Sequence, residues 1–306
     1  MSENQHLVRD VVVQTTVHDL RVSDELFRRE PPIDGRVELT DDLWIGSLGL
    51  DAVEAVLDAC GPPGLNFRPT RQFGHHYCVI REQRHSHFPS VKWDEDQRLR
   101  DCIALSRLVH PTTISTHFSA RLFYKNAELS MIVPGPTGGL GAYAFVNGPV
   151  WRNWLTKSDA AELGNLLALY DFGRMPNRLR RAMRHFQYAS LTYEFDVRFT
   201  LVVTGLEALV NTRDSNVSAQ FKKRLLLTAQ DVGMIVSEEQ AREAYSYRSN
   251  LSHGQRLQGN DIERQTRSSY EMLETLLRKL IKKAIDDQVF SGRFESETTI
   301  DAAYPI

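Results

Sequence analysis

The spacing of apolar residues changes near residue 150 of this 306-residue chain. Before that point, short runs rich in β-branched and aromatic residues are typical of strands. After it, apolar residues recur at the three- and four-residue intervals of amphipathic helices. The pattern predicts an α+β protein, with a mixed domain over residues 1–150 followed by an all-helical domain over residues 151–306.

The first half is expected to contain strands interrupted by helices. Strands are predicted at 10–17, 77–82, 118–124, 129–133 and 142–146, and helices at 51–60 and 94–109. The glycine-rich stretch 134–141 is predicted as a turn between two strands. It does not fit a phosphate loop, because no Lys-Ser/Thr pair and no helix follow it.

The second half is expected to form a helical bundle, because its helices are joined by short connections. Ser158 is the predicted cap of the first helix, Pro176 opens the second, and Ser237 with Gln240 forms a capping box. The helices are predicted at 158–173, 176–191, 199–210, 216–233, 237–254 and 261–287.

Composition limits the class of protein. The apolar fraction of 42% supports real cores, and the net charge of −2 means that a nucleic-acid site must be a local basic patch. Three widely spaced cysteines suit a reducing compartment better than a disulfide framework. No apolar run approaches a membrane span, and the N-terminal residues do not read as a signal peptide. We therefore expect a cytoplasmic protein.

The stretch "YRSNLSHG", residues 247–254, places polar groups at the end of a predicted helix. Arg248 and His253 are five positions apart, so they lie about 140° apart around an ideal helix. Their spacing alone is not informative, because Arg71 with His76 and Arg180 with His185 repeat it. The position distinguishes this occurrence, which follows a buried helix with one acid and precedes a long final helix.

The ordered segments "FTLVVTGLEALVN", "FKKRLLLTA" and "YSYRSNLSHG", followed by an amphipathic helix, resemble the HEPN family and its Apea-like branch. The resemblance covers roughly residues 175–287. It implies a helical bundle that dimerises, and a metal-independent endoribonuclease effector of a defence or toxin system. The first 150 residues lie outside the resemblance, and we expect them to act as a sensor or regulatory domain.

The resemblance maps the family's catalytic arginine and histidine onto Arg248 and His253, and its core acid onto Glu207. Ser249 occupies the position after the arginine where asparagine is frequent, and Asn250 could orient the phosphate or the imidazole. The chemistry is consistent, because RNA supplies its own 2′-OH nucleophile. Histidine exchanges protons near neutral pH, and arginine presents a planar fork to phosphate oxygens. The expected products are a 2′,3′-cyclic phosphate and a 5′-OH.

Several residues remain open to two interpretations. His253 could simply cap the C-terminus of its helix, and Glu207 could form an ordinary buried ion pair with a helix arginine. An arginine cluster is a candidate RNA contact, although such a run is more often a solvated helix face; it comprises Arg178, Arg180, Arg181 and Arg184. The tryptophans Trp151 and Trp154 are expected to pack the junction between the halves, and the alternative is that they stack on bases. The histidines near Cys78 lack the paired spacing of a zinc site, so neither a metal nor another cofactor is expected.

Two alternatives to the nuclease stay open from the sequence. One is a non-catalytic HEPN module that binds RNA or nucleotide. The other is an interaction subunit whose helical bundle simply dimerises. The expected partners are RNA, a second copy of the chain and, as a trigger, a regulatory or phage-derived protein, with no membrane involved.

Overall fold

The computed structural model describes residues 6–17, 28–60, 74–85, 97–112, 118–135, 152, 154–192, 194–212, 216–252 and 260–306. The chain divides into two compact units, Met1–Ala168 and Leu169–Ile306. The division falls later than the change in sequence pattern near residue 150. A sheet with helices in the first unit and helices alone in the described part of the second confirm the α+β class.

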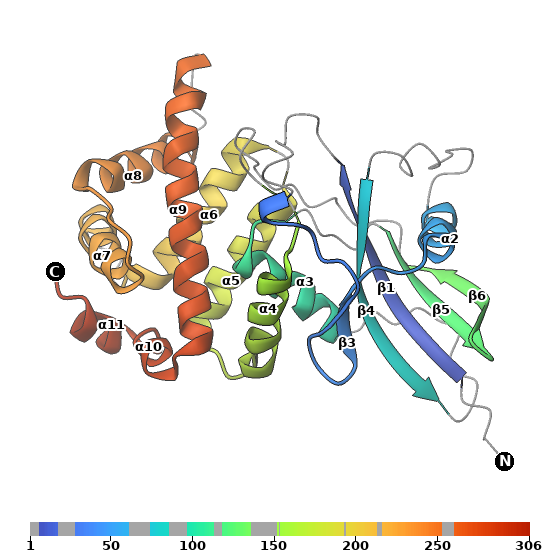
Figure 1. The fold of residues 1–306 in the computed structure, drawn as a ribbon. Helices are drawn as coiled ribbons and strands as arrows, with labels where there is room; N and C mark the ends of the chain where they lie inside the picture. The colour runs from blue at the N-terminus through green and yellow to red at the C-terminus, as the bar shows by residue number, and fades with distance from the viewer. Residues whose placement is uncertain are drawn as a thin grey trace. The chain divides into compact units, whose positions relative to one another are not determined.

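The first unit is built on an antiparallel sheet of six strands in the order β2-β3-β4-β1-β5-β6 (Figure 1). The strands are β1 (His6–Val17), β2 (Arg36–Glu38), β3 (Leu43–Gly46), β4 (Gly74–His85), β5 (Ser119–Lys125) and β6 (Glu128–Pro134). Four of the predicted strands are confirmed, and the fifth, 142–146, lies outside the described residues, as does the glycine-rich turn after residue 135.

Both faces of the central strand β1 are covered, which is why its valines at 11, 12 and 13 are all buried. On one face, α2 (Leu50–Cys60) packs Val53, Val56 and Leu57 against the sheet. On the other face, Asp10 accepts two hydrogen bonds from Arg121 on β5, at 2.6 and 2.9 Å. The buried carboxylate is therefore compensated by a directly opposed arginine.

Two further helices in the described part of the first unit are α3 (Gln97–Val109) and α4 (Lys157–Leu169). The predicted cap at Ser158 is wrong, because the helix begins one residue earlier. Thr156 is the capping residue: its hydroxyl accepts from the Asp159 amide at 3.3 Å, and the Asp159 carboxylate accepts from the Thr156 amide at 2.7 Å. The sequence prediction overlooked Thr156, although Asp159 lies three residues after it, where an acid can complete the cap.

Trp154 packs inside the first unit, where only 3% of its surface is exposed and its indole N–H donates to Glu30 O at 2.8 Å. Arg152, between the two tryptophans, is paired with Glu30 and Asp159. Trp151 lies outside the described residues. The structure therefore gives Trp154 a role in the core of one unit.

The second unit is helical wherever the structure describes it. Its helices are α5 (Asn177–Leu191), α6 (Phe195–Val210), α7 (Val217–Asp231), α8 (Glu238–Ser252), α9 (Asn260–Asp286), α10 (Gln288–Gly292) and α11 (Glu297–Ala303). The capping box predicted for α8 is confirmed: the Ser237 hydroxyl accepts from the Gln240 amide at 3.1 Å, and the Gln240 side chain accepts from the Ser237 amide at 2.9 Å.

Helix α6 is the core of this unit, because α5, α7, α8 and α9 all pack against it. Gly205 permits the close approach of two of them. A Cβ at this position would lie 2.8 Å from Leu277 on α9 and 3.4 Å from His185 on α5. No helix in the described part of the chain is both long enough and apolar enough to cross a membrane.

Candidate functional site

Arg248 lies on the face of α8 that packs against α6. Ala241 and Ala244 are fully buried, and Arg248 follows them at seven and four residues, which places all three on one side of the helix. The arginine therefore points to α6 because of its position in the apolar stripe of α8. About 31% of its side chain remains exposed, so it is accessible at one end.

Arg248 meets Glu207, which lies one turn before the end of α6. The Arg248 Nη2 atom lies 3.2 Å from Glu207 Oε2, and only 12% of the glutamate side chain is exposed. Burial raises the pKa of Glu207 above its ordinary value, and the attraction of Arg248 opposes that rise. The structure thus brings together two of the residues that the family resemblance singled out.

The remaining motif residues occupy the last turn of α8. Ser249 and Asn250 are half-buried, and the helix ends at Ser252. His253 and Gly254 lie outside the described residues. The described part of the candidate site therefore consists of Glu207, Arg248, Ser249 and Asn250.

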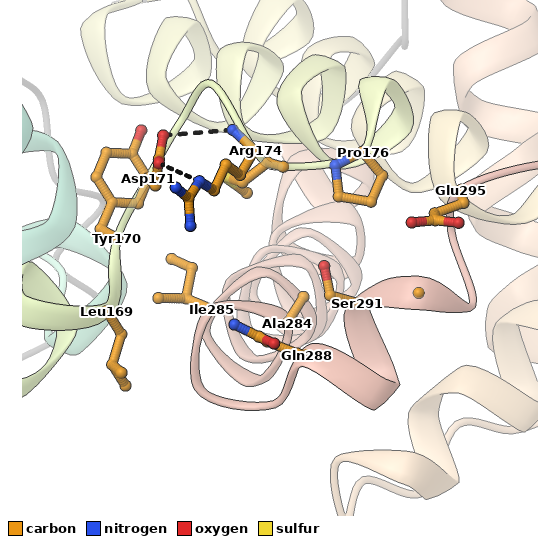
Figure 2. Close-up of a pocket in the computed structure, with 12 residues that line it drawn as sticks. Leu169, Tyr170, Asp171, Arg174, Pro176, Ala284, Ile285, Gln288, Ser291 and Glu295 are labelled. Carbon is orange, nitrogen blue, oxygen red and sulfur yellow. Dashed lines mark hydrogen bonds and ion pairs between the residues drawn. The ribbon is translucent and has the colours of Figure 1, made fainter.

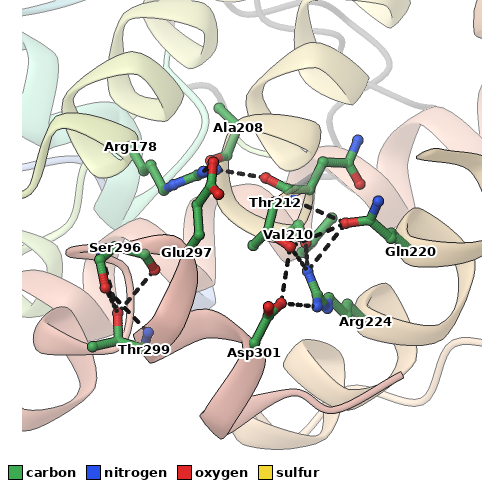
Figure 3. A network of polar contacts seen from close by, with 11 residues as sticks. Arg178, Ala208, Val210, Thr212, Gln220, Arg224, Ser296, Glu297, Thr299 and Asp301 are labelled. Atoms are coloured by element: carbon green, nitrogen blue, oxygen red, sulfur yellow. Dashed lines mark hydrogen bonds and ion pairs between the residues drawn. The ribbon is translucent and has the colours of Figure 1, made fainter. Parts of the chain in front are cut away.

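The end of α6 that carries Glu207 is held by two arginines from other helices (Figure 3). The last carbonyls of a helix have no partners within it. Arg178 on α5 donates to Ala208 O at 3.1 Å and to Asn211 O at 2.6 Å, and Arg224 on α7 donates to Val210 O at 2.8 Å. The two guanidinium groups therefore cap α6 directly after Glu207.

Both arginines are in turn paired with acids of the C-terminal helix α11. Arg178 Nη2 lies 3.5 Å from Glu297, and Arg224 Nη2 contacts Asp301. Arg224 also donates to Tyr304 O at 2.9 Å, and Asp301 accepts from Thr212 at 2.9 Å. Helix α11 thus stabilises the two arginines that hold the end of α6.

The other three predicted RNA-binding arginines are arranged differently from Arg178. Arg181 and Arg184 are exposed, and Arg180 is half-buried. The guanidinium carbons of Arg180 and Arg184 lie 6.0 and 5.6 Å from the ring centre of Phe172. These three arginines, which we call the α5 ridge, lie on α5 whereas Arg248 lies on α8, and α6 packs against both helices.

His185 is the second histidine in an arginine–histidine spacing of this unit. Its Nδ1 atom is buried and has no hydrogen-bond partner among the described residues. Burial, with a smaller contribution from Arg181, lowers the pKa of His185 below its ordinary value of 6.5. The described residues contain no group of three or more side chains suited to a metal ion.

The sequence interpretation missed Arg224, Glu297 and Asp301. A signal for Arg224 was present, because it is a cation within the apolar face "FKKRLLLTA" of α7. An arginine in such a position must find several acceptors when it is buried. Comparison of the chain with protein-family models, with curated proteins and with solved structures found no match.

Proposed function

We propose that the helical unit is a metal-independent endoribonuclease of the HEPN type. The observation that carries this proposal is the ion pair between Glu207 and Arg248 at the end of α8. The pair holds a guanidinium of which part is still exposed, so a phosphate can reach it from solvent. His253, which follows Arg248 by five residues in the sequence, is the proton-transfer group of the proposal.

In this proposal Arg248 binds the scissile phosphate and stabilises the charge that develops on it. His253 removes the proton of the 2′-OH or protonates the leaving 5′-oxygen. Asn250 orients the phosphate, and Ser249 contacts the RNA backbone. Glu207 is a positioning residue that holds Arg248. A homodimer through the helical unit would place two such sets in one groove, and the chain acts in the cytoplasm.

The test is incubation of the purified chain with total RNA in the presence of EDTA. The wild type should produce fragments with 2′,3′-cyclic phosphate and 5′-OH ends, and Arg248→Ala should not. Arg242→Ala is the matched control, because Arg242 lies on the same helix with 67% of its side chain exposed. Equal cleavage by the wild type and Arg248→Ala would disprove the assignment of the site.

A non-catalytic RNA-binding module is the second candidate, and the α5 ridge favours it. Arginines beside an aromatic ring provide both phosphate contacts and a surface for a base. Binding of RNA without any cleavage, abolished by substitution of the ridge but not of Arg248, would support this function in place of the nuclease.

We further propose that the first unit senses a trigger and restrains the nuclease. The basis is the division of the chain into two compact units, of which only the second carries the candidate site. Expression of residues 169–306 alone should be more toxic to cells than expression of the full chain. Equal toxicity, at equal protein levels, would remove the regulatory part of the proposal.

A further inference from the structure

A pocket of about 400 Å³ lies in the second unit, between the segment that joins α4 to α5 and the junction of α9 with α10 (Figure 2). Its volume lies near the lower end of the range for small-molecule sites, roughly 300–1,000 Å³. The residues of the Glu207–Arg248 pair are not among those that line it. The pocket is therefore separate from the proposed nuclease site.

One wall of the pocket is apolar. Ala284 and Ile285, at the end of α9, line the pocket together with Met175 and Pro176, which precede α5. Figure 2 shows Ile285 and Ala284 on the far side of the opening from Pro176. These side chains can pack against a short hydrocarbon chain, but they offer no hydrogen bonds to the polar groups of a ligand.

The charged residues that line the pocket, Asp171, Arg174 and Glu295, carry a net negative charge. Asp171 and Arg174 form an ion pair at one end, with Oδ2 and Nε 3.1 Å apart, and Asp171 also accepts from the Gly173 amide at 2.9 Å. Glu295 is the remaining charge. Among the described residues its carboxylate has neither an ion pair nor a hydrogen bond, and Figure 2 shows it turned toward Pro176 and Ser291.

Two neutral side chains with acceptor oxygens also line the pocket, and in Figure 2 Ser291 lies between Glu295 and Gln288. Ser291 on α10 and Gln288, one turn before it, both line the pocket, and their side chains make no hydrogen bond with the described residues. A carboxylate, a hydroxyl and an amide oxygen are three acceptors. A primary ammonium group offers three donors and no acceptor.

We propose that this pocket binds the cation of a primary alkylamine. The ammonium group is held by Glu295 and Ser291, and the alkyl chain lies against Ile285 and Met175. The net charge of the lining residues is −1, from Asp171, Arg174 and Glu295, so phosphates and carboxylates are disfavoured. The ligand class is accordingly a small aliphatic amine and not a nucleotide.

The test uses hexylammonium, hexanoate and hexan-1-ol as probes on the full-length chain. The six methionines can be labelled at their methyl carbons for NMR, and the Met175 signal can be assigned with Met175→Ile. Hexylammonium should shift the Met175 signal saturably in the millimolar range. Hexanoate should not bind, and hexan-1-ol should bind more weakly than the amine.

Glu295→Gln keeps the shape of the side chain and removes its charge. It should weaken hexylammonium binding by about two- to fivefold, since the charged partner of the ammonium is lost at an exposed position. Glu239→Gln is the matched control, because Glu239 is an exposed acid on α8, outside the pocket, and it should leave binding unchanged. No saturable shift with hexylammonium, equal binding of hexanoate, or an unchanged affinity in Glu295→Gln would overturn the proposal.

Discussion

The Glu207 carboxylate on α6 lies 3.2 Å from the Arg248 guanidinium on α8, with 12% of the glutamate side chain and 31% of the arginine side chain exposed. The acid is therefore mostly enclosed by the unit while the cation reaches its surface. This asymmetry suits a carboxylate that positions an arginine and an arginine that binds a ligand.

The pair predicts a pH dependence of stability. The pKa of Glu207 is raised above 4.5, so the folded chain keeps the Glu207 proton at pH values where the unfolded chain has lost it. The free energy of unfolding contributed by this residue therefore falls as the pH rises from the unfolded pKa through the raised one. Glu207→Gln cannot titrate and should lack this fall. Urea denaturation of both proteins across that window measures the difference, and identical pH profiles would contradict the raised pKa.

Arg224 should be one of the most sensitive positions of the helical unit. Only 1% of its side chain is exposed, and it holds Val210, Tyr304 and Asp301 together. Arg224→Met should cost about 3–5 kcal/mol, because it leaves buried acceptors without a donor. The exposed arginine Arg242 is the control, and Arg242→Met should cost less than about 1 kcal/mol. Midpoints of urea unfolding at constant m-value give both numbers, and similar losses would show that the network contributes little.

The sequence predicted the parts of the fold that repeat a pattern over several turns. The long apolar face of α9 and the Ser237–Gln240 box are both present, because local spacing determines them. Strands β2 and β3 and helices α10 and α11 were missed, since elements of three to seven residues are too short to show a period. These short elements depend on tertiary contacts for their formation. Helix α11, for example, is held by the contact between its Asp301 and Arg224 of α7.

The candidate site was predictable only in part for the same reason. Glu207 and Arg248 came from the order of segments in a family resemblance, whereas their contact depends on how α6 packs against α8. The role of Arg178 could not be inferred from its cluster of arginines. Its guanidinium is directed to Ala208 O and Asn211 O, although Arg181 and Arg184 of the same cluster are exposed.

The charge and the shape of Arg248 can be separated by substitution. Arg248→Lys keeps the charge and loses the planar fork, so RNA cleavage should fall strongly although folding is retained.

His253→Ala should reduce the rate of RNA cleavage by about 10²- to 10⁴-fold, the usual effect of losing an acid–base group. Asn250→Ala should cost less. His185→Ala is the matched histidine control. Rates are compared among variants with equal melting temperatures, and loss of cleavage in His185→Ala alone would place the catalytic histidine on α5.

His185 should itself give the folded state a measurable dependence on pH. Its pKa is lowered below 6.5, so the unfolded chain binds a proton there before the folded chain does. The free energy of unfolding should therefore decrease as the pH falls from 6.5 through the lowered pKa. His185→Leu removes the titrating group and should be insensitive in this range. Chemical denaturation at a series of pH values tests this, and a parallel decrease in the variant would assign the effect to another group.

The α5 ridge predicts how RNA binding depends on salt. Each phosphate contact to a single strand contributes about 0.7 to the slope of log affinity against log salt concentration. Substitution of Arg180, Arg181 and Arg184 by alanine should therefore reduce the slope by about 2 if all three bind phosphate.

The matched control replaces three exposed cations elsewhere in the unit, Lys223, Arg242 and Lys279, and should leave the slope unchanged. Arg178 is kept in both variants, because it caps α6 and its loss would perturb the fold. Fluorescence anisotropy with a labelled single-stranded RNA over a range of salt concentrations measures the slopes. Equal slopes in the wild type and the ridge variant would show that the ridge is a solvated helix face, and that any RNA contact lies elsewhere in the unit.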